Sequence, residues 1–121
     1  MAEHASQITL HVHDQEQNAY TIQLAVAAAG TGTLVILNTQ GQVMQQFALA
    51  QLQKSRDAKT LSCRVGFATA TMQLTAGTTP PALHIAARAF LPVFSATYTL
   101  SHEEQQRLLG WIAELPLRTL A

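Results

Sequence analysis

The stretch VFSATYTLSHEEQQRLLGWIAEL, residues 93–115, contains the two patterns that decide the fold of this chain. In its first part, residues 93–100, every second side chain is Phe, Ala, Tyr or Leu, and the side chains between them are Val, Ser or Thr. A period of two with one apolar face is typical of a half-buried β-strand. The sequence therefore predicts a strand that leads directly into the second pattern.

The second pattern is an amphipathic helix with its own start signal. Ser101 and Glu104 form a capping box, in which the Ser101 hydroxyl bonds the Glu104 amide and the Glu104 side chain reaches back. Leu108, Ile112 and Leu115 follow at positions i, i+4 and i+7, which places them on one apolar stripe. A proline directly after the stripe ends the pattern, so we expect a short C-terminal helix packed on the strands.

The same period of two recurs towards the N-terminus. Residues 8–12 and 20–26 alternate on either side of a polar turn, and we expect them to pair as an antiparallel hairpin. Residues 33–37 are apolar on both faces, as in a strand that is covered on both sides. The sequence Asn38-Thr39-Gln40-Gly41 then supplies a turn in which Gly41 takes a positive φ, and residues 43–49 return as the next strand.

Three segments leave room for more than one structure. Residues 48–53 fit either the end of a strand or one helical turn. The apolar side chains of residues 61–74 change phase part way along, and we expect one strand with a bulge or sharp bend near 66–69. Residues 82–91 fit a helix or a strand, and the clear strand that follows Pro92 favours the strand.

These elements predict one domain, residues 1–121, of the α+β class and mainly β. We expect six to seven antiparallel strands in a curled sheet, barrel or sandwich, capped by the C-terminal amphipathic helix, because a flat open sheet would expose its edges. This order of elements is similar to that of pleckstrin-homology-like domains, which also end in a capping helix. The first hairpin has no cluster of basic residues for a phosphoinositide head group, so the resemblance implies a fold and no function.

Charge and hydropathy limit the partners and the location that we expect. The seven basic and seven acidic residues cancel, and together they form 12% of the chain, against about 25% in a typical domain. No basic patch is present that would neutralise a phosphate backbone, so we expect no nucleic-acid partner. No apolar run approaches the roughly 18 residues that cross a bilayer, so we expect no membrane span. Residues 1–7 do not resemble a signal peptide, which predicts a cytoplasmic protein.

Few residues suggest chemistry. Cys63 is the only cysteine and lies in a strand pattern, so it forms no internal disulfide and we interpret it as a buried apolar side chain. No Gly-x-Ser-x-Gly segment is present, and no spacing brings two carboxylates together as an acid–base pair. We therefore predict no catalytic residues and no cofactor, and the sequence favours a protein that is not an enzyme.

His11 and His13 form the only arrangement that suggests a metal site. Two imidazoles at i and i+2 of a strand point the same way, which suits Zn²⁺ or another borderline ion, and His84 or His102 is a candidate distant ligand. The alternative interpretation is that both histidines fill the polar outer face of an alternating strand.

Three functional hypotheses follow. The sequence favours a non-catalytic binding or assembly module that acts through protein–protein contacts, with a protein partner or as a homo-oligomer, because low charge does little to resist self-association. The first alternative is a small metal-dependent enzyme or metal binder that uses His11 and His13. The second alternative is a barrel that binds a small apolar ligand in space left by its core alanines.

Overall fold

A computed structural model describes residues 6–65 and 70–119, and its main feature is an antiparallel β-barrel. Each strand from β1 to β7 pairs with the next along the chain, and β8 returns to β1 through the pair His13 and Thr99, which closes the barrel. The strands are β1 (Ser6–His13), β2 (Ala19–Val26), β3 (Gly32–Leu37), β4 (Val43–Lys54), β5 (Thr60–Val65), β6 (Ala70–Thr75), β7 (Ala82–Arg88) and β8 (Pro92–Thr99).

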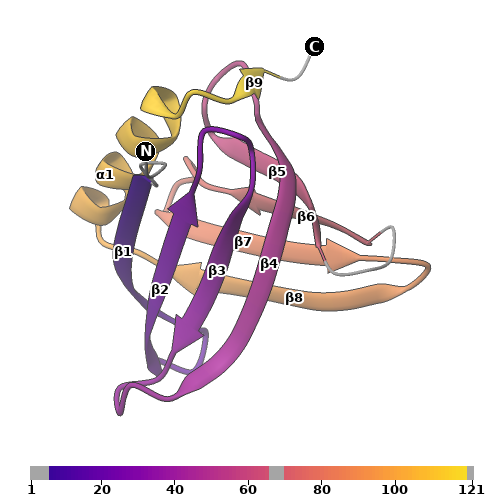
Figure 1. Cartoon of the computed structure of the whole chain (residues 1–121). Helices are drawn as coiled ribbons and strands as arrows, with labels where there is room; N and C mark the ends of the chain where they lie inside the picture. The colour runs from indigo at the N-terminus through magenta and orange to yellow at the C-terminus, as the bar shows by residue number, and fades with distance from the viewer. Residues whose placement is uncertain (1–5, 66–69, 120–121) are drawn as a thin grey trace.

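The chain then forms α1 (His102–Glu114) and a two-residue strand, β9 (Arg118–Thr119), which pairs parallel with the end of β4. In Figure 1, β1 to β4 run steeply and β6 to β8 run nearly across them, so the two halves of the barrel cross at a large angle. Among the residues that the structure describes, no helix is long and apolar enough to cross a membrane. The prediction of a mainly β fold with a curled sheet or barrel and one C-terminal helix is confirmed.

The predicted count of six to seven strands is wrong, because the segment 61–74 contains two strands. β5 and β6 are antiparallel neighbours, and Cys63 pairs with Met72 and Leu61 with Leu74. Directly paired residues of an antiparallel ladder lie on one face of the sheet. Here odd-numbered residues of β5 pair with even-numbered residues of β6, so the apolar positions change phase between the strands, as they would at a bulge. The bulge or bend was expected near residues 66–69, which lie outside the described residues.

The other two ambiguous segments are strands. β7 buries Leu83, Ile85 and Ala87 and exposes the side chains between them, as the favoured alternative for residues 82–91 predicted. β4 continues through residues 48–53, where the helical turn was the other possibility, and its pairing with β5 shifts between Ala50 and Gln53. The predicted positive φ of Gly41 is also confirmed, at 78°.

The core of the barrel comes from the inward face of every strand. Alternation along β1 and β6 is regular, with buried and exposed side chains in strict succession from residue 7 to 13 and from 70 to 74. Burying the larger apolar side chains removes each of them from water at a gain of about 1.5–3 kcal/mol. The largest fully buried ones inside the barrel are Leu10, Ile22, Leu24, Leu34, Ile36, Leu61, Met72, Leu74, Leu83 and Ile85.

α1 packs beside β1 and is held at both ends. The Ser101 Oγ accepts a hydrogen bond from the Glu104 N–H at 3.0 Å, so the predicted N-cap is confirmed. The expected return contact from the Glu104 side chain to the Ser101 amide is wrong, since this carboxylate accepts a hydrogen bond from the backbone of β1 instead. At the other end, the Lys54 Nζ donates to the carbonyls of Ala113 and Leu115 at 2.9 and 2.7 Å.

The buried face of α1 contains the predicted stripe and one polar residue that the sequence did not suggest. Leu108, Ile112 and Leu115 are all buried. Gln105 is buried as well, and its amide satisfies two backbone groups of the loop between β6 and β7: it accepts from the Gly77 N–H at 3.0 Å and donates to the Thr78 carbonyl at 3.2 Å. A buried amide with both ends bonded fixes the helix against this loop.

Candidate interaction surface at the barrel seam

The barrel closes at one narrow place, which we call the seam: the line where the edge of β1 faces the edge of β8. The two strands share a single residue pair, His13 with Thr99, and the Thr99 Oγ1 adds a hydrogen bond to the His13 carbonyl at 3.3 Å. From this point the two strands diverge, because they belong to the two halves of the barrel that cross each other (Figure 1). Each strand therefore has an edge that the other does not cover.

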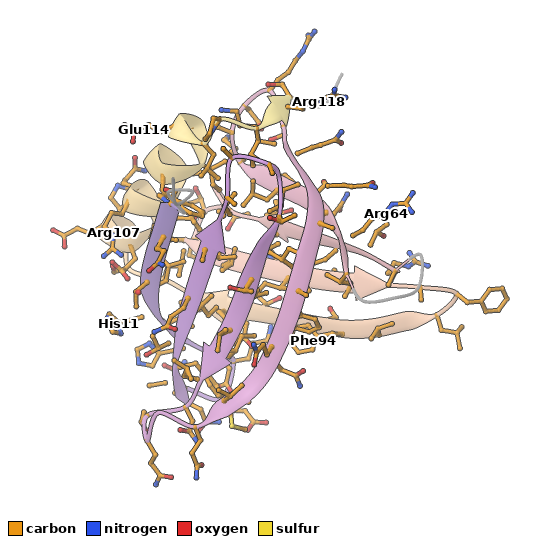
Figure 2. The ribbon with its side chains drawn as sticks, in the orientation of Figure 1. His11, Arg64, Phe94, Arg107, Glu114 and Arg118 are labelled. Atoms are coloured by element: carbon orange, nitrogen blue, oxygen red, sulfur yellow. The ribbon has the colours of Figure 1, made fainter. Side chains whose placement is uncertain are left out.

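The edge of β1 is covered by side chains of α1. The Glu104 Oε2 accepts from the His11 N–H at 2.9 Å, and the Arg107 Nη2 donates to the Thr9 carbonyl. Glu104 and Arg107 also form an ion pair with a distance of 2.8 Å between Oε1 and Nη1. The Trp111 Nε1 donates to the Ser6 Oγ at 2.8 Å. Figure 2 shows Arg107 and His11 on the same side of the molecule, where α1 lies along β1.

The edge of β8 has no such cover among the described residues. The Leu100 N–H donates to the Pro81 carbonyl at 3.2 Å, and since backbone groups alternate sides along a strand, the even-numbered residues of β8 bond β7. The odd-numbered residues Ser95 and Thr97 therefore direct their N–H and C=O groups away from β7. Val93 lies where the register of β7 and β8 shifts, between Ala87 and Arg88, so the alternation does not extend to it. Within the part of the chain that the structure describes, β8 pairs on that side only at Thr99.

The sequence of this bare edge does not protect it. Natural sheet edges are usually blunted by charged side chains, proline or a covering element. Residues 93–97 contain no Asp, Glu, Lys, Arg or His. β8 contains one proline, Pro92, which is its first residue. Val93 and Ser95 are exposed and Thr97 is half-buried. A bare, uncharged edge of this length is a template for pairing with another chain.

The apolar tip of the β7–β8 hairpin continues this edge. Phe90 is 97% exposed, Leu91 68% and Val93 62%, which makes them the most exposed large apolar side chains in the described part of the chain. Single exposed apolar residues are common on protein surfaces, but a continuous exposed group marks a contact site. We name the residues Phe90, Leu91 and Val93 the apolar tip.

An open groove of about 510 Å³ lies between the β1–β2 turn and β8, and Ser95, Ala96 and Thr97 of the bare edge line part of it. Tyr20 and Tyr98 line it and meet edge to face, with ring centroids 5.9 Å apart. Asp14 and Glu16 contribute carboxylates from the turn. Although desolvation acts in the opposite direction, hydrogen bonds from Asn18 and from the Glu16 amide hold the pKa of Asp14 below its ordinary value. The groove therefore combines aromatic surface with fixed negative charge.

The two histidines of the metal hypothesis lie on the outer face of β1. His11 and His13 are both exposed, so the predicted common face is present. Across residues 6–65 and 70–119, no three His, Cys, Asp or Glu side chains gather closely enough to hold a metal ion. His84 and His102 are therefore not brought in as further ligands, and His84 instead shares a hydrogen bond of 2.9 Å with the Thr97 Oγ1. Binding of a metal ion by two histidines alone stays a prediction.

Cys63 is buried, as the sequence predicted. Burial raises the pKa of its thiol to about 11, so the group stays protonated at neutral pH. The thiolate is the nucleophilic form of cysteine, and this side chain is therefore inert in the folded barrel. The thiol packs against the Met72 carbonyl, with the Sγ 3.8 Å from the oxygen.

Sequence reasoning missed both the bare edge and the apolar tip. The signal for the tip was present in Phe90-Leu91-Pro92, three apolar residues in a row at the turn between two strands. The bare edge had no local signal, because whether a strand edge is covered depends on elements distant in the sequence. The comparisons with known proteins add no relative: no family model, no curated protein and no solved structure matches this chain.

Proposed function

We propose that this chain is a non-catalytic assembly module that works through protein–protein contacts. The observation that carries the proposal is the apolar tip, which places Phe90 and Leu91 in water beside an uncharged strand edge. Aromatic and large aliphatic side chains in such positions gain free energy when a partner covers them, at about 25 cal/mol for each Å² removed from water. Centrally placed aromatic residues are also typical of the residues that dominate binding energy.

The weak charge of the chain supports the same proposal. Its formal net charge is zero, so long-range repulsion between copies or from a partner is small. The outer faces of β2 and β8 carry Thr, Gln and Ser, which cost less free energy to remove from water than charged side chains would. No observation on the described residues favours the metal-binding or the apolar-ligand alternative over assembly.

Photo-cross-linking tests the proposal at the tip itself. A variant with benzoylphenylalanine in place of Phe90 is expected to form a cross-linked protein adduct, either with itself or with another protein, in the cells that produce the chain. The matched control has the same group in place of Val43, which is 55% exposed at the start of β4 in a different hairpin. The proposal is wrong if position 90 gives no adduct beyond the amount formed at position 43.

A further inference from the structure

We propose that the bare edge of β8 docks a second copy of this chain, with the two β8 strands antiparallel about a two-fold axis at Ser95. The inference rests on the proposed assembly function and names both the partner and the surface. It follows from three features of the seam: the backbone phase of β8, the absence of charge along it, and the positions of the apolar tip and the groove along this edge.

The backbone phase suits self-pairing. Ser95 and Thr97 direct their N–H and C=O groups outward, whereas Val93 lies at the register shift between β7 and β8. With the axis at Ser95, this residue lies opposite its own copy, and Val93 of each chain lies opposite Thr97 of the other. The two Ser95 residues exchange two hydrogen bonds in an antiparallel ladder, so the N–H and C=O at the centre of the bare edge are satisfied.

The length of the bare edge fits the same register. Beyond Thr97 the edge is taken by β1, which pairs with Thr99. In the second copy, the position opposite Thr99 is Leu91, where β8 has not yet begun and the hairpin turns. The docked strand therefore ends where β1 begins to occupy the edge, and the two chains do not compete for the same backbone groups.

Charge along the edge permits a two-fold axis. Such an axis brings each side chain close to its own copy, so a single charged residue near the centre would meet an equal charge. Residues 93–97 contain none. The zero formal net charge of the chain adds no repulsion at longer range.

The ends of the edge complement each other. In this register, Phe90 and Leu91 of one chain approach the aromatic part of the other chain's groove, where Tyr20 lies against Tyr98. Asp14 and Glu16 line the same groove from the β1–β2 turn. The contact occurs twice, once at each end of the paired strands, as an isologous interface requires. A foreign extended peptide would satisfy the backbone groups of β8 but would leave the apolar tip in water, and this favours the second copy as the partner.

Sedimentation velocity of the full chain tests the inference. The wild-type protein is expected to sediment as a dimer, at twice the chain mass of 13.1 kDa. Ser95→Pro removes an outward N–H without touching the bonds to β7, and Ser95→Lys places two like charges at the axis, so both variants are expected to be monomers. Gln73→Lys is the matched control, because Gln73 is exposed on β6, a strand paired on both sides, and this variant stays a dimer.

Circular dichroism separates loss of pairing from loss of folding. If Ser95→Pro unfolds, Ser95→Lys decides, together with hydrogen exchange of the Ser95 and Thr97 amides, which we expect to be protected in the wild type and to exchange faster in the lysine variant. A wild-type monomer, or a dimer that persists in folded Ser95→Lys protein, overturns the inference. A monomer whose position 90 still cross-links to a different protein overturns the second copy as partner and leaves the proposed assembly function standing.

Discussion

Of the two strand edges that meet at the barrel seam, one is covered by another element of the described chain and the other is not. The edge of β1 is covered by α1, whose Glu104 and Arg107 side chains bond the His11 amide and the Thr9 carbonyl. The edge of β8 has the same kind of backbone groups at Ser95 and Thr97, and no element of the described chain covers them. The comparison shows that side chains of α1 bond the edge backbone groups of β1, as a neighbouring strand would. The edge backbone groups of β8 have no such partner among the described residues.

The difference does not come from the strands themselves. Both have polar, mostly uncharged outward side chains, Thr9 and His11 in β1 and Ser95 and Thr97 in β8. The difference between the two edges comes from the segment after β8. This segment forms α1, which packs along β1. Changes that loosen α1 should therefore make the edge of β1 resemble that of β8.

The largest effect is expected from Leu108→Ala, which removes a fully buried side chain between α1 and the barrel. Large-to-small changes at such positions cost about 2–5 kcal/mol of unfolding free energy, because a cavity adds to the lost burial. Urea unfolding at one fixed protein concentration measures this cost. Gln106→Ala, on the exposed face of the same helix, is the control and should change stability by less than about 0.5 kcal/mol. A small cost for Leu108→Ala would show that α1 does not depend on this contact.

A smaller effect is expected from Glu104→Ala, which uncovers the edge of β1 directly. The side chain of Glu104 is 16% exposed, and it bonds both the His11 amide and the Arg107 guanidinium. The hydrogen bond to the amide is exposed, so water can replace the carboxylate, and its loss costs about 0.5–1.5 kcal/mol. Hydrogen exchange should show faster exchange of the His11 amide. Glu103→Ala removes a neighbouring carboxylate from the same helical turn, and unchanged exchange at His11 in this variant would isolate the edge contact.

The smallest effect is expected from Ser101→Ala, which removes the N-cap of α1. Its hydroxyl satisfies the Glu104 amide, and losing an N-cap costs about 1 kcal/mol. Ser101→Asp keeps a capping oxygen and should retain most of the stability in the same urea experiment. If both variants lose stability equally, the serine acts through something other than the cap.

Local patterns predicted much of the fold. The alternation of residues 8–12 and 20–26 fixed which side chains face the core, because a strand exposes successive residues to opposite sides whatever it pairs with. The helix after Ser101 was predictable for the same reason: cap, apolar stripe and stop all lie within one turn or a few turns. The eighth strand was missed because a bulge and a hairpin leave the same change of phase in residues 61–74.

The candidate site was hardly predictable. The sequence pointed to His11 and His13, which lie side by side on the outer face of β1 with no third ligand gathered among the described residues. It did not point to Ser95, which has an unremarkable side chain and matters only through its backbone. A backbone group carries no residue-specific signal, so its availability appears only when all the neighbouring strands are placed.

By itself, the sequence of this protein determined its strand faces and its C-terminal helix, since periodicity and capping are local properties. Only the tertiary structure decided that the strands close into a barrel, that Glu104 serves β1 instead of its own helix cap, and that β8 keeps a bare edge. These depend on contacts between residues far apart in the chain, such as His11 with Glu104, and no pattern along the chain encodes which distant backbone group remains unpaired.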